Sequence, residues 1–536
     1  MINKPLIVHN DGRLFLIQKY DEHYHVEDQV NTFATLQKAL SNIHTYRLDK
    51  YSLWSAAFLG VKALEIIDIL DDYSINIIPE KIKNFIKSEL ESFWTMELYI
   101  ENDIVRLKGN ADAIKKILAI EALEKMIEAR EKDALYFKIS NLYNLRLELI
   151  KTNVFLKEMN DGVGYTDLKL NLDIKLYNYQ KLAVKKFIGE DKNHINGRGL
   201  IIMPPGSGKT MVALKIIEEL GVRTLIIVPD KKIYEDIWLV EIEKNTNYEE
   251  KDVSYNSFED KTITFYSYIE AARKLSKPND KWGLIIYDKA FRLAADLSRE
   301  TAFISSKYKL ALDSTIARGN TDDMSIYRAI GPKVIDLPLK KLEENYQIKV
   351  KCTEIKIPYV PWTDKSEKSG FHTISKNIKK VEALKYILKL HPDNNFVLAS
   401  YYRSVAKKIS EELKIKDIST GEPKNDKRDI LLRKFNNNET KIVIITEIIE
   451  DMALENIDIL VSLSYRQGSK REEYKRIGKL KSSNTWSKKI GYYYALVATG
   501  TEEEKKYRVR RNEMINQGYD FSILPLKKLR SKAYEI

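Results

Sequence analysis

The chain of 536 residues contains one cysteine, Cys352, which excludes an internal disulfide framework and a zinc site built from several cysteines. It also lacks any apolar run approaching the roughly 20 residues of a membrane-spanning helix. Its N-terminus, Met-Ile-Asn-Lys-Pro, has neither the apolar core nor the cleavage site of a signal peptide. No tandem repeat or low-complexity tract is present. We therefore expect a soluble, cytoplasmic protein without a membrane partner.

The composition is that of a globular protein with an excess of positive charge. Apolar residues make up 44% and charged residues 31%, and 89 basic against 77 acidic residues give a formal charge of +12. Such an excess favours a polyanionic partner. The basic residues gather in two clusters, which are either nucleic-acid contacts or solvated helix faces. The first comprises Lys470, Arg471, Lys475, Arg476, Lys479, Lys481, Lys488 and Lys489, and the second Lys505, Lys506, Arg508, Arg510 and Arg511.

The length predicts several domains, and the hydrophobic pattern divides the chain into four. Residues 1–95 combine a short strand with helical periodicity, for example over Val30–Leu40. Residues 96–165 show an α+β pattern, with helices expected over Ile114–Ala129 and Leu142–Glu158. Residues 166–345 and 346–536 would then form two further domains.

These two C-terminal segments alternate short, fully apolar strands with helices, the pattern of parallel α/β sheets. The strands expected in the first are Gly199–Met203, Thr224–Val228, Thr262–Tyr266 and Leu284–Tyr287, and those in the second are Phe396–Ala399, Lys441–Ile445, Ile457–Ser462 and Tyr492–Val497. The stretch Val350–Asn377, which contains Pro358 and Pro361, is expected to be an irregular connection.

A phosphate-binding loop is the strongest local motif. The predicted strand Gly199–Met203 leads into Pro-Pro-Gly-Ser-Gly-Lys-Thr, and a helix is expected from Lys209. Glycines let backbone amides converge on phosphate oxygens, and the helix N-terminus adds partial positive charge. In such loops the lysine reaches the β- and γ-phosphates and the hydroxyl ligates Mg²⁺. The predicted nucleotide-binding residues are Pro205, Gly206, Ser207, Gly208, Lys209 and Thr210, with Met203 replacing the first glycine of the usual pattern.

Other segments resemble superfamily 2 helicases of the XPB DNA repair family. Leu176-Tyr-Asn-Tyr-Gln180 resembles their Gln motif, so Gln180 would read adenine; otherwise it is an ordinary polar residue at a helix start. Pro5–Asp11 and His44–Leu48 resemble the N-terminal domain of bacterial XPB proteins, and residues 96–165 resemble the damage-recognition domain of the family. Further resemblances lie at Ile330–Lys333, Gly468–Glu473 and Gly518–Tyr519.

The resemblance also shows where catalytic motifs have changed. Asp288 is retained and would help to hold the Mg²⁺ shell, but Lys289 stands where the family has the glutamate that polarises water. Lys289 could instead point into solvent while a nearby acid substitutes. Asp313 replaces the first residue of a Ser-Ala-Thr triplet, and Arg318 alone remains of an Arg-Glu-Asp element.

The second lobe shows changes of the same kind. Ala453 stands at the position of a ribose-contacting aspartate, and Ser482 at that of an arginine expected at the γ-phosphate. Arg476 and Gly478 persist, which leaves Lys209, Asp288 and Arg476 as candidate catalytic residues.

The resemblance thus implies two RecA-like parallel-sheet lobes preceded by small α+β domains. It predicts an ATP- and DNA-binding helicase homologue of DNA repair or DNA metabolism with impaired hydrolysis. ATP with Mg²⁺ would be its cofactor, bound through Gln180, the loop, Thr210 and Asp288. DNA would be its partner, beside a protein such as a nuclease or an active helicase. An active ATP-dependent DNA translocase and a protein scaffold without DNA binding are the alternatives.

Overall fold

The computed structural model describes most of the chain, and its residues fall into two compact units. One unit is residues 1–203 with 209–337, and the other is residues 338–536 with 204–208. The described residues are 4–24, 26–40, 42–101, 103–151, 154–159, 169–189, 197–257, 261–275, 282–314, 325–337, 348–361, 370–416, 418–419, 426–446, 454, 456–465, 473, 476–478, 480, 489–516 and 518–534. No helix among them is long and apolar enough to cross a membrane.

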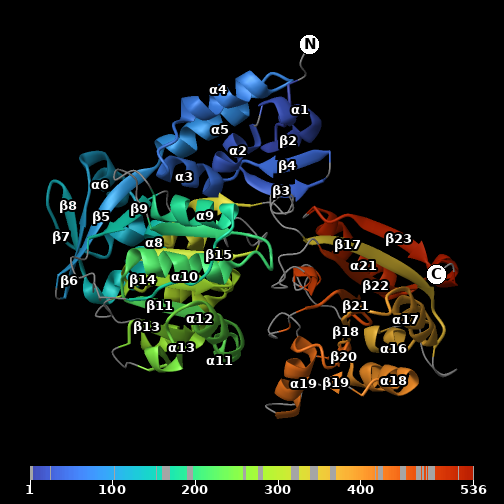
Figure 1. Ribbon diagram of the computed structural model, residues 1–536. Coiled ribbons are helices and arrows are strands. Elements are labelled where there is room, and N and C mark those ends of the chain that lie inside the picture. The colour runs from blue at the N-terminus through green and yellow to red at the C-terminus, as the bar shows by residue number, and fades with distance from the viewer. Residues whose placement is uncertain are drawn as a thin grey trace. The chain divides into compact units, whose positions relative to one another are not determined.

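The N-terminal region contains a four-stranded sheet of order β1-β2-β4-β3, covered by helices (Figure 1). Its strands are β1 (Leu6–Val8), β2 (Arg13–Ile17), β3 (Thr35–Ala39) and β4 (Ile43–Arg47), and its helices are α1 (Gln18–Tyr24), α2 (Val26–Phe33), α3 (Lys50–Phe58), α4 (Ala63–Tyr73) and α5 (Glu80–Glu91). The helix predicted over Val30–Leu40 is wrong beyond Phe33. Its second half is the edge strand β3, because backbone pairing with β4 outweighs helix propensity.

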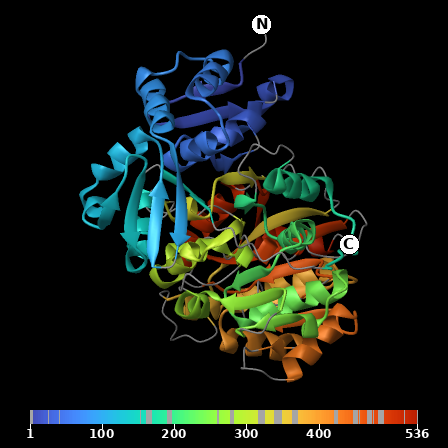
Figure 2. The same cartoon turned by 90° about the vertical axis from the view of Figure 1, so that its left-hand side faces the viewer.

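The following region contains a five-stranded sheet of order β7-β8-β6-β5-β9 (Figure 2, cyan). Its elements are β5 (Trp94–Glu101), β6 (Ile104–Lys108), α6 (Ala111–Leu118), α7 (Glu121–Glu124), β7 (Ile127–Arg130), β8 (Ala134–Lys138), η1 (Ile139–Asn141), α8 (Leu142–Lys151) and β9 (Val154–Glu158).

Two helix predictions in this region are wrong in their length. The segment Ile114–Ala129 is two short helices and the start of β7, and Leu142–Glu158 is α8 followed by β9. β9 pairs in parallel with β5, and its residues Val154 and Phe155 are buried. Valine and phenylalanine have high strand propensity, so this segment forms a strand and does not continue the helix.

The first lobe is built on a seven-stranded sheet of order β12-β13-β11-β14-β15-β10-β16, in which all strand pairs are parallel. Its strands are β10 (Arg198–Ile202), β11 (Thr224–Val228), β12 (Val253–Tyr255), β13 (Ile263–Ser267), β14 (Trp282–Asp288), β15 (Ser306–Asp313) and β16 (Lys333–Asp336). Its α-helices are α9 (Asn178–Ile188), α10 (Lys209–Leu220), α11 (Lys231–Ile233), α12 (Val240–Asn245), α13 (Tyr268–Lys274) and α14 (Asp296–Arg299). Shorter turns are η2 (Tyr234–Leu239, a π-helix), η3 (Glu250–Asp252), η4 (Ala290–Ala294), η5 (Glu300–Phe303) and η6 (Ser325–Ala329).

The second lobe is a seven-stranded parallel sheet of order β19-β20-β18-β21-β22-β17-β23. Its elements are β17 (Ile348–Pro358), α16 (Phe371–Ser375), α17 (Ile378–Leu390), β18 (Phe396–Ala399), α18 (Arg403–Leu413), β19 (Ile418–Ser419), α19 (Asp426–Asn436), β20 (Ile442–Ile445), β21 (Ile459–Ser462), β22 (Lys489–Thr499), α21 (Glu502–Asn516), β23 (Phe521–Pro525) and α22 (Leu526–Tyr534).

The predicted strands of both lobes are present, and the predicted fold class is confirmed. Thr224–Val228 and Phe396–Ala399 match to the residue. The irregular connection predicted from Val350 is wrong in its first half, since β17 runs to Pro358 between β22 and β23. Three of the four sheets lie within one predicted range each, and the five-stranded sheet begins at Trp94, two residues before the predicted range 96–165. The boundaries themselves stay predictions, and the predicted linker at residues 161–164 lies outside the described residues.

Within the first unit, the N-terminal region is fastened to the first lobe through Ile330–Lys333. The buried Lys333 ammonium donates to the Ala34 carbonyl oxygen (2.8 Å), and the Tyr51 hydroxyl donates to the Gly331 carbonyl oxygen (3.1 Å). Gly331 has a φ of +146°, and a Cβ atom there would lie 2.7 Å from the Arg198 carbonyl carbon, so only glycine fits. This motif therefore has a structural role in joining two domains.

Candidate functional site

The predicted phosphate-binding loop has the required conformation. It follows the fully buried strand β10, and Gly206 and Gly208 have φ values of +75° and +74°, in the left-handed region that glycine adopts without strain. The Lys209 ammonium donates to the Met203 carbonyl oxygen (3.0 Å), so its charge lies at the loop. Lys209 and Thr210 begin α10, a helix of 12 residues whose N-terminal amides and dipole favour a phosphate.

Asp288 lies at the same edge of the sheet as this loop. β15 pairs with both β10 and β14, with Ile202 opposite Asp313 and Asp288 opposite Leu312. The carboxyl ends of these three parallel strands therefore bring the loop and Asp288 to one edge, where open α/β sheets bind ligands. This is the arrangement that a Mg²⁺ ion shared by Thr210 and Asp288 requires.

Trp238 orients the Asp288 carboxylate, and sequence reasoning missed it. Its indole nitrogen donates to Asp288 Oδ2 (3.0 Å), and the ring is fully buried. Trp238 lies in the π-helix Tyr234–Leu239, a feature that often marks functional sites. The Tyr268 hydroxyl donates to the Asp288 backbone carbonyl oxygen (2.9 Å), and burial together with the Asp288 charge raises the pKa of Tyr268 well above its ordinary value. No sequence motif marks these two aromatic residues.

Lys289 directly follows β14, and Asp313 is the last residue of β15. Lys289 adopts a left-handed conformation, with φ 53° and ψ 54°, which costs a residue with a Cβ atom about 1–2 kcal/mol. The buried Asp313 carboxylate accepts hydrogen bonds from the backbone amides of Phe291 (2.8 Å) and Ser314 (2.7 Å). Asp313 thereby fixes the turn that follows β14. Lys289 lies between Asp288 and this turn.

Gln180 lies in the first turn of α9 and is buried. Its side-chain oxygen accepts a hydrogen bond from the Tyr177 backbone amide (2.9 Å), so it caps the helix. The rings of Tyr177 and Tyr179 stack beside it, with centroids 5.6 Å apart. This geometry agrees with the structural role that the sequence left open, and the predicted contact with adenine stays a prediction.

The residues of this edge fit a nucleotide with its metal ion. The loop and the helix N-terminus supply donors for phosphate oxygens, and Thr210 and Asp288 supply oxygen ligands of the kind that Mg²⁺ prefers. Among the described residues, no group of three or more His, Cys, Asp or Glu side chains could hold a metal ion by itself. Mg²⁺ would therefore depend on the phosphates of the nucleotide for part of its ligand shell.

In the second lobe, Arg476 belongs to a buried charge network. Its Nη1 lies 3.3 Å from Glu473 Oε1 and donates to the Ser462 hydroxyl (3.0 Å), while its guanidinium stacks 4.4 Å from the Tyr401 ring centre. Burial, the largest single effect, lowers the pKa of Arg476, but the Glu473 carboxylate together with Tyr401, Tyr493 and Tyr465 outweighs it, so the pKa is raised. The side chain is thus held within the lobe, and its predicted catalytic role stays a prediction.

Comparison with known proteins shows which family the chain resembles. The family model described as ERCC3/RAD25/XPB C-terminal helicase matches residues 342–535, that of the type III restriction enzyme res subunit matches 173–318, and that of the helicase conserved C-terminal domain matches 6–132. The DNA 3'-5' helicase XPB of Mycobacterium tuberculosis is 25% identical, over 98% of both chains. The general transcription and DNA repair factor IIH helicase/translocase subunit XPB of Enterocytozoon bieneusi is 24% identical, over 97% of this chain and 92% of its own.

The chain is thus similar over nearly its whole length to XPB-type superfamily 2 helicases. Among solved structures, Dbp5 of S. cerevisiae bound to RNA and ADP BeF3 matches with a TM-score of 0.48 and 14% identity, covering 67% of this chain and 93% of that chain.

The predicted departures from the XPB-type motor motifs fall at described and undescribed positions. Lys289 and Asp313 occupy neighbouring strand ends of the first lobe. The other altered positions, Gly319, Asn320, Ala453 and Ser482, lie outside the described residues. The structure therefore locates two of the predicted departures, and both are at the carboxyl edge of the sheet that carries the phosphate-binding loop.

The two basic clusters differ in what the structure describes. Most of the first cluster lies outside the described residues, and its member Arg476 is buried. In the second cluster, Lys505, Lys506 and Arg508 are exposed on α21, whereas Arg510 is buried, with its Nη1 3.3 Å from Glu473 Oε1. Arg511 pairs with Glu354. Two of the five residues in this cluster are therefore committed to ion pairs within the lobe.

Replacing Glu473 with glutamine should destabilise the second lobe. Glu473 is fully buried, faces both Arg476 and Arg510, and accepts a hydrogen bond from the Tyr493 hydroxyl. The substitution keeps the side-chain shape but leaves two buried guanidinium groups without their carboxylate, which costs about 3–5 kcal/mol in comparable buried pairs. Thermal unfolding of the full chain measures the effect. The control is the same substitution at Glu412, an exposed residue that forms an ion pair. An unchanged unfolding temperature for Glu473→Gln would contradict the stabilising role of the buried charge network.

Proposed function

We propose that this chain binds ATP with Mg²⁺ and DNA, as an XPB-type helicase homologue whose ATP hydrolysis is impaired. The observation that carries the proposal is the contrast along one sheet edge. The phosphate-binding loop is intact, with Gly206, Gly208 and Lys209 in place, while Lys289 stands directly after Asp288. The relatives named as DNA helicases support the DNA partner. A role in DNA repair or DNA metabolism, with a protein partner such as a nuclease or an active helicase, belongs to the same proposal.

The loss of hydrolysis follows from the chemistry at position 289. A charged lysine cannot accept a proton from water, and positioned general bases contribute about 10²–10⁴-fold to rate. Asp313, the acid at the end of the neighbouring strand β15, accepts hydrogen bonds on both carboxylate oxygens from the backbone amides of Phe291 and Ser314. It is therefore held to the backbone, which disfavours it as a substitute base. Nucleotide binding needs neither residue, so it survives.

DNA binding should persist and should be mostly electrostatic. Helicase lobes hold the phosphate backbone through basic side chains and amides, which requires no catalytic base. We expect little dependence on base sequence and a steep fall in affinity as salt rises. Replacing four residues of the first cluster with glutamine should lower the slope of log K against log salt by about 0.9 for each duplex phosphate that is no longer neutralised. The four residues are Lys470, Arg471, Lys475 and Lys479.

The matched control removes four exposed lysines elsewhere in the same lobe, namely Lys385, Lys389, Lys407 and Lys416. The control has the same net charge as the cluster variant, so only a local contact distinguishes the two. Fluorescence anisotropy on single-stranded, duplex and forked DNA across a salt series measures both. Equal slopes for the two variants would leave the cluster as a solvated surface. No binding to any of the three DNAs at low salt would favour the protein-scaffold alternative.

A further inference from the structure

The Asp288 carboxylate, at the carboxyl edge of the first-lobe sheet, is supported by a residue fifty positions earlier in the chain. Trp238 Nε1 donates a hydrogen bond to Asp288 Oδ2 (3.0 Å). An indole N–H only donates, so it does not compete with the carboxylate for a cation. A carboxylate has about four lone-pair sites, so one such bond leaves sites for a metal ion. Trp238 is therefore placed to orient Asp288 without blocking it.

Aromatic packing restricts the Trp238 ring to this orientation. The side chain is fully buried, and its ring packs edge to face on Phe265 of β13, with ring centres 5.8 Å apart. Tyr234, four residues earlier in the same π-helix, also packs on Phe265 (4.8 Å) and stacks on Tyr255 of β12 (5.0 Å). Edge-to-face and stacked rings stabilise each other beyond the burial of their area. The π-helix is thus anchored to the sheet by two aromatic residues, one of which reaches Asp288.

The π-helix follows a strand that lies next to β14. β11 ends at Val228, and Asp230 caps the helix that follows by accepting a hydrogen bond from the Ile233 amide (3.1 Å). α11, η2 and α12 then follow one another without a break from Lys231 to Asn245. β11 and β14 are paired, so this helical segment starts beside the strand end that carries Asp288. π-helical turns are rare and frequently lie at functional sites, and this one contains the residue that contacts Asp288.

The backbone of Asp288 is held as well. The Tyr268 hydroxyl donates to the Asp288 carbonyl oxygen (2.9 Å), and Tyr268 is buried at the start of α13. The last residue of β14 is therefore held at its carbonyl by Tyr268 and at its carboxylate by Trp238. Hydrogen-bond partners of this kind fix the orientation of a metal ligand and tune the metal.

Lys289 raises the question of whether this edge still needs a metal ion. Its position directly after Asp288 brings a positive charge to the strand end, and an ammonium could balance nucleotide phosphates in place of Mg²⁺. In that case the Asp288 carboxylate would repel the phosphates, and a hydrogen bond that holds it in place would bring no advantage. The support of Asp288 by Trp238 instead favours a cation that the carboxylate and the phosphates hold together.

We infer that Trp238 is a positioning residue that holds Asp288 for Mg²⁺, so that nucleotide binding by this chain remains metal-dependent despite the lysine that follows Asp288. The inference rests on the proposed nucleotide site and names the residue that sets its metal affinity. Thr210 and Asp288 would hold the ion, and Trp238 would act only through Asp288. Its effect should therefore appear only when the metal is present, whereas a purely structural contribution would change nucleotide binding with and without metal.

The test is the gain in ATP affinity that Mg²⁺ produces, which is the Kd for labelled ATP in EDTA divided by the Kd in excess Mg²⁺. Both are measured on the purified full chain. Removing a hydrogen-bond partner of a metal ligand typically costs about 10–100-fold in metal affinity. Trp238→Phe keeps an aromatic ring but loses the indole N–H. It should lower the gain by about tenfold or more and leave the Kd in EDTA unchanged.

The outcomes separate this inference from the proposed function. A gain in Trp238→Phe equal to that of the wild-type chain would overturn the inference and leave the nucleotide site in place. Equal affinities of the wild-type chain in EDTA and in Mg²⁺ would also overturn it, because nucleotide binding would then be independent of metal. No ATP binding by the wild-type chain under either condition would overturn the proposed function and the inference with it.

Trp282→Phe is the matched control. Trp282 begins β14, the strand that Asp288 ends, and its buried indole nitrogen has no hydrogen-bond partner in the described part of the chain. This substitution removes the same group from the neighbourhood of the same strand and should leave the gain at its wild-type value. In an Asp288→Asn background, Trp238→Phe should have no further effect on the gain, because the interaction between the two residues is already lost. A further loss in that background would assign Trp238 a purely structural role and contradict the inference.

Tryptophan fluorescence supplies a readout that does not depend on the folding of Trp238→Phe. When Asp288 takes up a cation, the charge beside the Trp238 indole changes, so adding Mg²⁺ to the ATP complex should shift the emission of the chain. The shift should be present in Trp282→Phe and absent in Asp288→Asn. A shift that persists in Asp288→Asn would place the metal away from Asp288 and contradict the inference.

Discussion

Lys209→Ala is expected to weaken ATP binding by about 10- to 100-fold, the equivalent of about 1.5–3 kcal/mol for a charge-assisted hydrogen bond. The Lys209 ammonium lies at the loop, where it donates to the Met203 carbonyl oxygen, and it is placed to exchange that partner for phosphate oxygens. Alanine leaves the glycine conformations and the helix N-terminus intact, so folding should be preserved. Binding of labelled ATP with Mg²⁺ to the purified chain measures the change in affinity.

The control is Lys215→Ala on the same helix. The Lys215 ammonium pairs with Glu218 (2.6 Å) and Glu219 (2.9 Å), one turn along α10, and has no predicted contact with nucleotide. Lys215→Ala removes the same charge from the same helix as Lys209→Ala. It should leave the ATP affinity within about twofold, because a surface ion pair contributes less than about 1 kcal/mol. Equal affinities of Lys209→Ala and Lys215→Ala would show that the loop does not bind the nucleotide as proposed.

Lys289→Glu alone is not expected to restore hydrolysis. A recovered general base would raise turnover about 10²–10⁴-fold if it were the only missing part. Asp313 still replaces the serine of the triplet, and its buried carboxylate at the neighbouring strand end would repel the new glutamate. Ala453 and Ser482 also remain in the second lobe. Substitutions at residues that act together in catalysis have strongly non-additive effects, so restoring one residue should raise turnover only slightly.

The measurement is DNA-stimulated ATPase of Lys289→Glu beside Lys289→Gln. Glutamine removes the positive charge without supplying a base, so the difference between the two variants isolates the base. We expect both to stay well below the roughly 1–100 s⁻¹ of competent phosphoryl-transfer enzymes. A 100-fold gain for the glutamate variant over the glutamine variant would mean that the other substitutions have been misjudged.

Much of the fold could be predicted because the lobe strands are buried on both faces. Such strands are continuous apolar runs, as in Thr224–Val228 and Phe396–Ala399. β17 was missed because Pro358 and Pro361 outweighed the alternation of lysine with apolar residues that precedes them. The helix predicted over Val30–Leu40 was wrong in its second half because β3 forms by pairing with the following strand β4, and the helical periodicity on which the prediction rested does not register that pairing.

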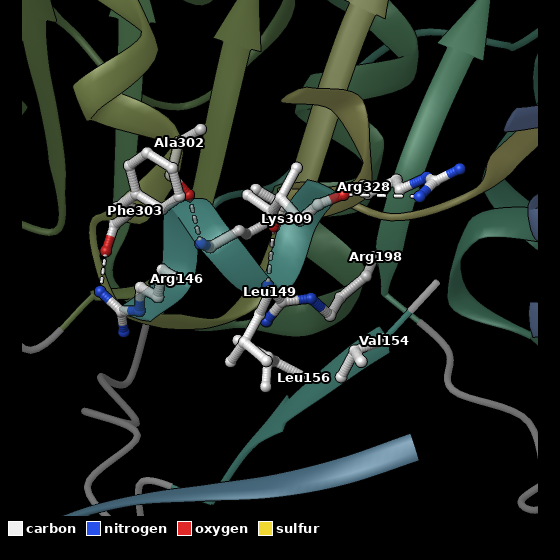
Figure 3. Close-up of a pocket in the computed structure, with 11 residues that line it drawn as sticks. Arg146, Leu149, Val154, Leu156, Arg198, Ala302, Phe303, Lys309 and Arg328 are labelled. Atoms are coloured by element: carbon white, nitrogen blue, oxygen red, sulfur yellow. Dashed lines mark hydrogen bonds between the residues drawn. The ribbon is translucent and has the colours of Figure 1, made fainter. Parts of the chain in front are cut away.

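The candidate site was predictable where a contiguous motif carries it. The loop from Pro204 to Thr210 has its chemistry in the seven consecutive residues after Met203, and Asp288 ends a buried strand. Trp238 could not be predicted, because its contact with Asp288 depends on the packing of a π-helix fifty residues earlier in the chain. The pocket lined by Arg146, Arg198, Lys309 and Arg328 was equally hidden, since these side chains become neighbours only when two domains meet (Figure 3).

The most direct test of the central claim is ATP binding and ATP turnover measured on the same purified chain, with and without DNA. The Lys209→Ala variant, measured in the same two assays, supplies the background level of ATP binding and of ATP turnover. The account predicts Mg²⁺-dependent ATP binding that Lys209→Ala weakens about 10- to 100-fold. It also predicts turnover far below about 1 s⁻¹ that DNA does not raise into the range of active enzymes. DNA-stimulated turnover of about 1–100 s⁻¹ that Lys209→Ala abolishes would contradict it, and would make the chain an active ATP-dependent translocase despite Lys289.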